Sequence, residues 1–101
     1  MRVFVMLNPT NKHGTKMAYS KLRKFLETDG YIMIQSEVFM RVTTNRKGAE
    51  KHFRRIKEYN PGTGCIRMFT MTEKQYKNIW LLTGEDDYQE LTVGSNCHIM
   101  L

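Results

Sequence analysis

The sequence predicts an α+β fold in which two helices cover one face of a small antiparallel sheet. Three observations predict it: a length of 101 residues, which fits one domain with a single core, several short apolar runs rich in β-branched residues, and two segments with apolar residues at helical spacing. The apolar fraction of 41% and the charged fraction of 26% are average for globular proteins, so the composition disfavours intrinsic disorder.

The elements of the first half follow from these patterns. Residues 2–7 form an apolar, β-branched run before a proline, which predicts a strand buried on both faces. Residues 16–28 place apolar side chains on one side and basic ones on the other, which predicts an amphipathic helix that ends at Gly30. The β-rich stretch of residues 31–43 predicts two strands with a break near Ser36.

The second half continues the alternation. Asn45 is a candidate N-cap for a second helix that runs to about Glu58. A turn rich in Pro and Gly follows, and then residues 65–71 predict a strand, residues 72–75 a short helical turn, and residues 78–82 a last short strand.

The order is therefore strand, helix, strand, strand, helix, strand, with one extra strand at the end. Right-handed crossovers arrange this order as a four-stranded antiparallel sheet with both helices on one face, the ferredoxin-like βαββαβ sandwich. The extra strand can pair with the edge of a second copy, so we expect a homodimer. We expect residues 1–84 to form this domain and residues 85–101 to form an acidic C-terminal tail that contacts a partner.

The charge distribution indicates an anionic partner. Residues 1–57 hold thirteen Lys and Arg against four Asp and Glu, a net +9, whereas residues 58–101 hold three against six, a net −3. Such an asymmetry is typical of a protein whose basic part binds nucleic acid and whose other part makes a different contact. The second helix is the densest basic segment, with Arg46, Lys47, Lys51, Arg54, Arg55 and Lys57.

Membrane, export and disulfide classes are disfavoured. No apolar run approaches the roughly 18 residues that span a bilayer, and the chain does not start with a charged segment followed by an apolar one. Cys65 and Cys97 lack metal-ligand spacing, so we expect reduced thiols. We therefore expect a cytoplasmic protein with no membrane partner.

A resemblance to a known family covers roughly residues 6–85. It is carried by the segments YSKLRKFLETDGYIMIQSEVF, RIKEYNPGTGCIRMFTMTEKQY and LLTGE, in this order and with nearly constant spacing. These segments resemble the small CRISPR-associated spacer-acquisition protein in its type II-like form. That protein is the non-integrase partner of the CRISPR integrase and was historically called a CRISPR-associated endoribonuclease.

The resemblance implies a dimeric scaffold that bridges two integrase dimers and holds double-stranded DNA by backbone contacts before its insertion into the CRISPR array. It also implies that the last strand crosses to the partner subunit and that the acidic tail reaches the integrase. The residues expected at these partner interfaces are Ile79, Trp80, Leu81, Leu82, Glu85, Asp86 and Asp87.

The resemblance further implies a metal-dependent nuclease acting on RNA or DNA, with an Asp at the end of the first strand. In this sequence the matching position falls at Leu7, or at Asn8 after a one-residue slip. Magnesium requires hard anionic oxygen ligands, which neither residue offers. We therefore expect a catalytically silent protein with no metal site, and magnesium only if some nuclease activity exists.

Two enzyme alternatives stay open at this point. A magnesium-dependent nuclease could use another carboxylate, such as Glu37 or Asp29, and a toxin-like ribonuclease on the same fold is a further class. No cofactor is required for DNA binding itself.

The basic residues at the helix starts are the leading DNA-binding candidates, because free backbone N–H groups at a helix start also attract phosphate. The candidates are Lys12, Lys16, Arg41, Arg46 and Lys47. His13 and His52 have no metal-ligand neighbours at suitable spacing, so we expect them on the surface.

Overall fold

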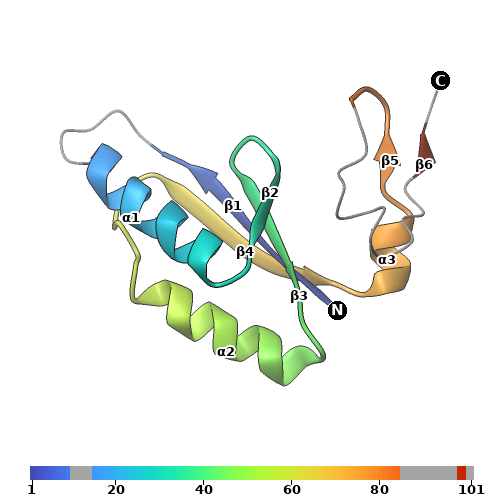
Figure 1. Ribbon diagram of the computed structural model, residues 1–101, viewed down its shortest axis with the longest axis horizontal. Coiled ribbons are helices and arrows are strands. Elements are labelled where there is room, and N and C mark those ends of the chain that lie inside the picture. The colour runs from blue at the N-terminus through green and yellow to red at the C-terminus, as the bar shows by residue number, and fades with distance from the viewer. Residues whose placement is uncertain (10–14, 85–97, 100–101) are drawn as a thin grey trace. The chain divides into compact units, whose positions relative to one another are not determined.

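The computed structural model describes residues 1–9, 15–84 and 98–99, and the chain divides into two compact units, residues 1–70 and 71–101. The elements in chain order are β1 (Arg2–Asn8), α1 (Thr15–Thr28), β2 (Ile32–Gln35), β3 (Val38–Val42), α2 (Arg46–Lys57), β4 (Cys65–Met71), α3 (Glu73–Lys77), β5 (Trp80–Leu81) and β6 (His98–Ile99). Figure 1 shows α1 and α2 on the same face of the main sheet. The expected ferredoxin-like α+β fold is confirmed, whereas the homodimer stays a prediction.

The main sheet has the strand order β2-β3-β1-β4, with β3 antiparallel to both β1 and β2. Side chains of a strand alternate between the two faces of its sheet. On β1, Val3, Val5 and Leu7 belong to the core beneath the helices, whereas Phe4 lies on the opposite face. The ring of Phe4 stacks there on Phe69 of β4, with the ring centroids 5.0 Å apart. The predicted burial of this strand on both faces is therefore confirmed, because all four residues from Arg2 to Val5 are buried.

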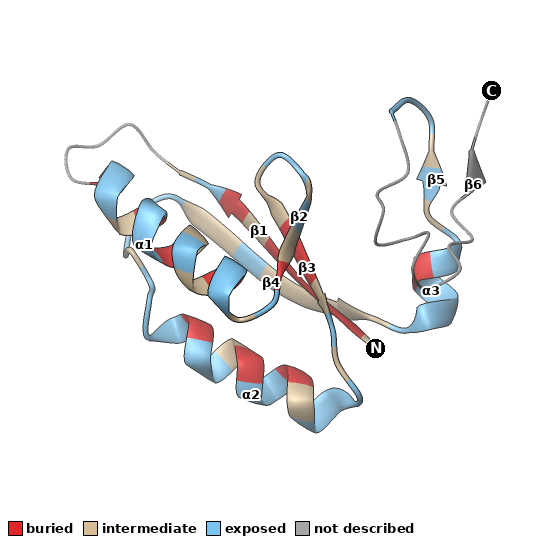
Figure 2. Cartoon of the chain, in the orientation of Figure 1, coloured by how far each residue is buried: buried red, intermediate tan, exposed pale blue. Residues whose placement is uncertain are grey.

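The core forms because each helix directs one apolar stripe at the sheet. Tyr19, Leu22 and Leu26 of α1 recur at spacings of three and four residues, and all three are fully buried. Ala49 and Ile56 do the same on α2. In Figure 2 the buried bands of both helices alternate with exposed ones, so the outer face of the helical layer is left to polar and charged side chains.

The helix ends follow the local sequence signals. Gly30 has a φ of +94° directly after α1, which is the left-handed conformation that a glycine adopts at a helix end. The side chain of Asn45 accepts a hydrogen bond from the backbone N–H of Gly48 and caps α2, as expected. Thr72 and Gln75 form a reciprocal capping box at the start of α3.

The second unit departs from the sequence prediction in two ways. Asn78 is the C-cap of α3, so β5 is shorter than the strand expected over residues 78–82. The strand β6 was not expected, and it pairs with β5 in parallel. Pairing of β5 with a second copy stays a prediction. Among the residues that the structure describes, no helix is long and apolar enough to cross a membrane.

Two glycines of the loop before β4 provide a matched test of the packing at the end of β1. Both have a left-handed backbone, with φ of +76° at Gly62 and +74° at Gly64. A Cβ on Gly62 would meet nothing within 4 Å, whereas one on Gly64 would lie 2.6 Å from the backbone oxygen of Asn8 and would also clash with the hydroxyl of Tyr19.

We expect Gly62→Ala to lower the free energy of unfolding by about 1 kcal/mol, the cost of a left-handed alanine. We expect Gly64→Ala to lower it by about 3 kcal/mol, because the backbone of β1 must also move. Urea denaturation of the two variants and the parent measures the difference. Equal losses in the two variants would contradict the close packing of the loop on β1.

Candidate nucleic-acid interface

The end of β1 carries no acidic side chain. Leu7 is buried in the core beneath the helices, and its backbone N–H donates to the carbonyl oxygen of Glu37 at 2.8 Å. Asn8 is exposed and offers only a neutral amide. The amide cannot take up a proton at neutral pH and is a weaker magnesium ligand than a carboxylate.

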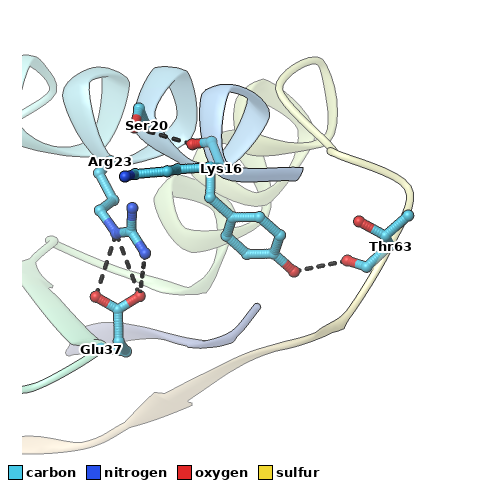
Figure 3. Close-up of polar contacts among 6 residues, drawn as sticks. Lys16, Ser20, Arg23, Glu37 and Thr63 are labelled. Carbon is cyan, nitrogen blue, oxygen red and sulfur yellow. Dashed lines mark hydrogen bonds and ion pairs between the residues drawn. The ribbon is translucent and has the colours of Figure 1, made fainter. Parts of the chain in front are cut away.

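Glu37, whose backbone bonds to this strand end, carries a carboxylate that is held by an arginine. It occupies the turn between β2 and β3 with a φ of +57°. The Arg23 Nη2 donates to Oε2 of Glu37 at 2.7 Å, and its Nε lies 3.2 Å from both carboxylate oxygens, as the dashed lines in Figure 3 mark. Both oxygens that could bind a metal therefore already accept hydrogen bonds from a fixed positive charge.

Asp29 is the second candidate carboxylate, and it lies at the centre of a buried polar cluster. Its side chain is only 7% exposed and accepts a hydrogen bond from Arg55 Nη2 at 2.5 Å. His52 Nδ1 lies 3.2 Å from its other carboxylate oxygen. Arg41 on β3 lies 3.5 Å from the same carboxylate and also donates to the backbone oxygen of Asp29. We call Asp29, Arg41, His52 and Arg55 the Asp29 cluster.

The expectation that His52 lies on the surface is wrong, because the residue is only 8% exposed. The reason is visible in the helix period: His52 follows Ala49 by three residues and precedes Ile56 by four, so it lies on the buried stripe of α2. Its ring meets that of Tyr31 edge-on, with the centroids 6.1 Å apart.

Burial sets the protonation of this region. Loss of solvent lowers the pKa of His52, and the positive charge of Arg41 lowers it further, although Asp29 opposes the change. Burial likewise raises the pKa of Tyr31 to about 12. The Tyr31 hydroxyl is buried and has no hydrogen-bond partner among the described residues. His52 is therefore neutral at physiological pH, and it donates one hydrogen bond to Asp29.

The magnesium ion that the family resemblance implies does not fit these side chains. A metal would have to displace Arg23 from Glu37, or two arginines and a histidine from Asp29. Within the described ranges, no group of three or more His, Cys, Asp or Glu side chains could hold a metal ion.

The predicted DNA-binding residues do not form one cluster. Lys16, Arg46 and Lys47 are exposed, but Lys12 lies outside the described residues. Asp29 after the end of α1 contacts the middle of α2, whose chain runs back along α1, so the two helices are antiparallel (Figure 1). Lys16 therefore lies at the opposite end of the helical layer from Arg46 and Lys47. The Arg41 guanidinium belongs to the Asp29 cluster.

The predicted partner-interface residues lie partly in the described chain. Trp80 is 59% exposed and Leu82 is also exposed, whereas Ile79 and Leu81 are half-buried. Residues 85–87, the acidic part of the prediction, lie outside the described residues.

Sequence reasoning missed one basic, partly aromatic hollow on the helical layer. It has a volume of about 300 Å³ and is lined by Lys21, Lys24, Phe25, Thr28 and Tyr59. The four residues from α1 have spacings of three and four, which place them on one helix face, and this signal could have been found in the sequence. Tyr59 could not, because it follows α2 in the chain and reaches Phe25 only through the helix packing.

Comparisons with known proteins identify the same family as the sequence segments. A family model described as CRISPR associated protein Cas2 matches residues 13–79. Relatives named CRISPR-associated endoribonuclease Cas2 include one from Acidovorax ebreus, 36% identical over 94% of this chain and 94% of the relative. One from Streptococcus mutans is 39% identical over 86% of this chain and 81% of the relative, and one from Treponema denticola is 31% identical over 99% and 100%.

The lowered pKa of His52 predicts a stability that decreases at acidic pH. The ordinary pKa of histidine is 6.5, so between that value and the lower pKa of the folded state the unfolded chain binds more protons. We therefore expect the free energy of unfolding to be fully retained above about pH 6.5 and to decrease as the pH falls below it.

Chemical denaturation between pH 7.5 and 5.5 measures this change. The matched variant is His52→Asn, whose amide nitrogen can replace Nδ1 next to Asp29 but does not titrate. Its stability should change less over the same interval. Parallel pH profiles for the parent and the variant would show that His52 titrates alike in the folded and unfolded chains.

Proposed function

Because the chain belongs to the Cas2 family of CRISPR-associated proteins, we propose that it acts in CRISPR adaptation as a scaffold for double-stranded DNA. In this proposal a homodimer bridges two integrase dimers and holds protospacer DNA by its phosphate backbone, without cutting it. The observation that carries the proposal is the exposed basic surface of α1 and α2, combined with carboxylates that arginines already hold.

The charges at the helix starts support phosphate binding. Neither α1 nor α2 has an acidic residue in its first turn, whereas Lys16 lies in the first turn of α1 and Arg46 and Lys47 lie in that of α2. A positive side chain next to the positive end of a helix dipole is unfavourable by about 0.3–1 kcal/mol. A bound phosphate would offset this cost, and backbone contacts suit a protein that must accept any sequence.

The dimer in this proposal uses β5. This two-residue strand contains the exposed Trp80, is followed by the exposed Leu82, and has one neighbour, β6, within the described chain. A second copy that pairs with the remaining edge of β5 would bury these side chains. The tail of residues 85–101, with its acidic Glu85, Asp86 and Asp87, is proposed to contact the integrase, whereas residues 1–84 form the DNA-holding domain.

The competing function is a magnesium-dependent endonuclease, since the relatives are named endoribonucleases. It would need Glu37 or Asp29 as the catalytic carboxylate. The two-nitrogen grip of Arg23 on Glu37, and the burial of Asp29 among two arginines, oppose this role. Releasing either carboxylate would leave a partly buried arginine charge without its partner.

Binding to a duplex of about 30 base pairs in the presence of the integrase should weaken steeply as salt rises. The logarithm of the binding constant should fall linearly with the logarithm of salt concentration, with a slope of about −0.9 for each phosphate contact. Replacing Lys16, Arg46 and Lys47 by Gln should make the slope shallower by about 0.9 for each phosphate contact that the substitutions remove from each copy.

The matched control is Lys74→Gln, which removes an exposed lysine of α3 outside the two basic helices and should leave the slope unchanged. Fluorescence anisotropy at several salt concentrations gives the slopes. A flat salt response, or the absence of any complex with the integrase, would sink the proposal.

Highly purified protein should not cleave RNA or duplex DNA, with or without magnesium, because its carboxylates are engaged. Gel analysis of labelled substrates tests this directly. Cleavage that survives purification, disappears in Glu37→Ala and persists in Glu50→Ala, an exposed carboxylate of α2, would establish the nuclease instead.

A further inference from the structure

We propose that the hollow between α1 and the segment after α2 binds an unpaired nucleotide, with the base stacked on Tyr59 and the phosphate held by Lys21 and Lys24. This site is additional to the duplex-backbone contacts, and it does not depend on them. The chemistry it would recognise is an aromatic base joined to a phosphate, either as a free nucleotide or at an unpaired end of a strand.

The aromatic part of the site is preorganised. The rings of Phe25 and Tyr59 are stacked with their centroids 4.2 Å apart and their planes inclined by 16°. Phe25 is half-buried, whereas Tyr59 is 41% exposed, so the stack is anchored on α1 and reaches the solvent through the tyrosine. A base that stacks on an exposed aromatic ring is recognised by its π-face, which every base has.

Arg55 fixes the position of this stack. Its guanidinium carbon lies 5.9 Å from the centre of the Phe25 ring, while its Nη2 donates to Asp29. The ion pair holds the guanidinium next to Phe25, and the cation attracts the negative face of the ring. The stack therefore does not have to be ordered when a ligand binds, which reduces the entropic cost of binding.

The basic part of the site has charges without internal partners. Lys21 and Lys24 are exposed, and neither makes an ion pair with a described residue, in contrast to Arg23, Arg41 and Arg55. With Phe25 and Thr28 they form a stripe on α1 at spacings of three, four and seven residues. Flexible ammonium groups bind a phosphate as point charges, without requiring one fixed orientation.

The size of the hollow favours a small ligand. Its volume of about 300 Å³ lies at the lower end of the range for small-molecule sites. A base pair within a duplex presents only its edges to a protein, because its faces are stacked on its neighbours. The site therefore selects for an unpaired base over a paired one.

The test uses the full chain alone, without integrase, and adenosine monophosphate as the probe. Backbone amide shifts in NMR titrations should map to Lys24, Phe25 and Tyr59. Tyr59→Ala should weaken binding by about tenfold or more, the loss expected for one stacked base. Tyr59→Phe keeps the ring and should retain binding, which separates stacking from a folding defect.

The phosphate contact has its own comparison. Adenosine, which lacks the phosphate, should bind several-fold more weakly than the monophosphate, and replacing both Lys21 and Lys24 by Gln should remove that difference. Lys51→Gln is the matched control, because Lys51 is an exposed lysine of α2 that does not line the hollow.

A 5′-phosphorylated oligoadenylate and a blunt duplex complete the experiment. Tighter binding of the oligonucleotide than of the monophosphate identifies a strand end as the source, and equal or weaker binding identifies a free nucleotide. The proposal is overturned if the duplex displaces the monophosphate as well as the oligonucleotide does, if a polyglutamate peptide competes equally, or if the shifts map outside the hollow.

Discussion

The Asp29 cluster is the interaction on which the helical layer depends. A single carboxylate, which follows α1, accepts hydrogen bonds from two side chains of α2 and lies near an arginine of β3. Three elements that are distant in the sequence are thereby fixed at one point. Because the carboxylate is almost fully buried, removing one partner would leave an uncompensated charge, which typically costs about 3–5 kcal/mol.

The antiparallel packing that this cluster fixes decides where the basic residues lie. It places Tyr59 against Phe25, which creates the hollow, and it puts the start of α1 and the start of α2 at opposite ends of the layer. The basic charges are therefore spread along the outer face of the layer. A long anion such as a DNA duplex can contact such a surface at several separate points, each through phosphate.

The arginines of this protein separate into two roles. Arg23, Arg41 and Arg55 neutralise the carboxylates at the ends of α1 and β2, while lysines carry most of the exposed charge on α1. This division follows from side-chain chemistry, because the planar guanidinium satisfies both oxygens of a carboxylate and the ammonium group does not. The same division that opposes metal binding leaves the lysines available to phosphate.

The sequence by itself determined the fold class, the order of the elements and the caps at Gly30 and Asn45, because these depend on hydrophobic period and on local backbone preference. It also determined that no acid stands at the end of β1. Only the tertiary structure decided that His52 is buried, that Arg41 serves Asp29 and that Tyr59 meets Phe25. These contacts join residues of different elements, and a local pattern carries no information about which ring or charge a helix will meet once it packs.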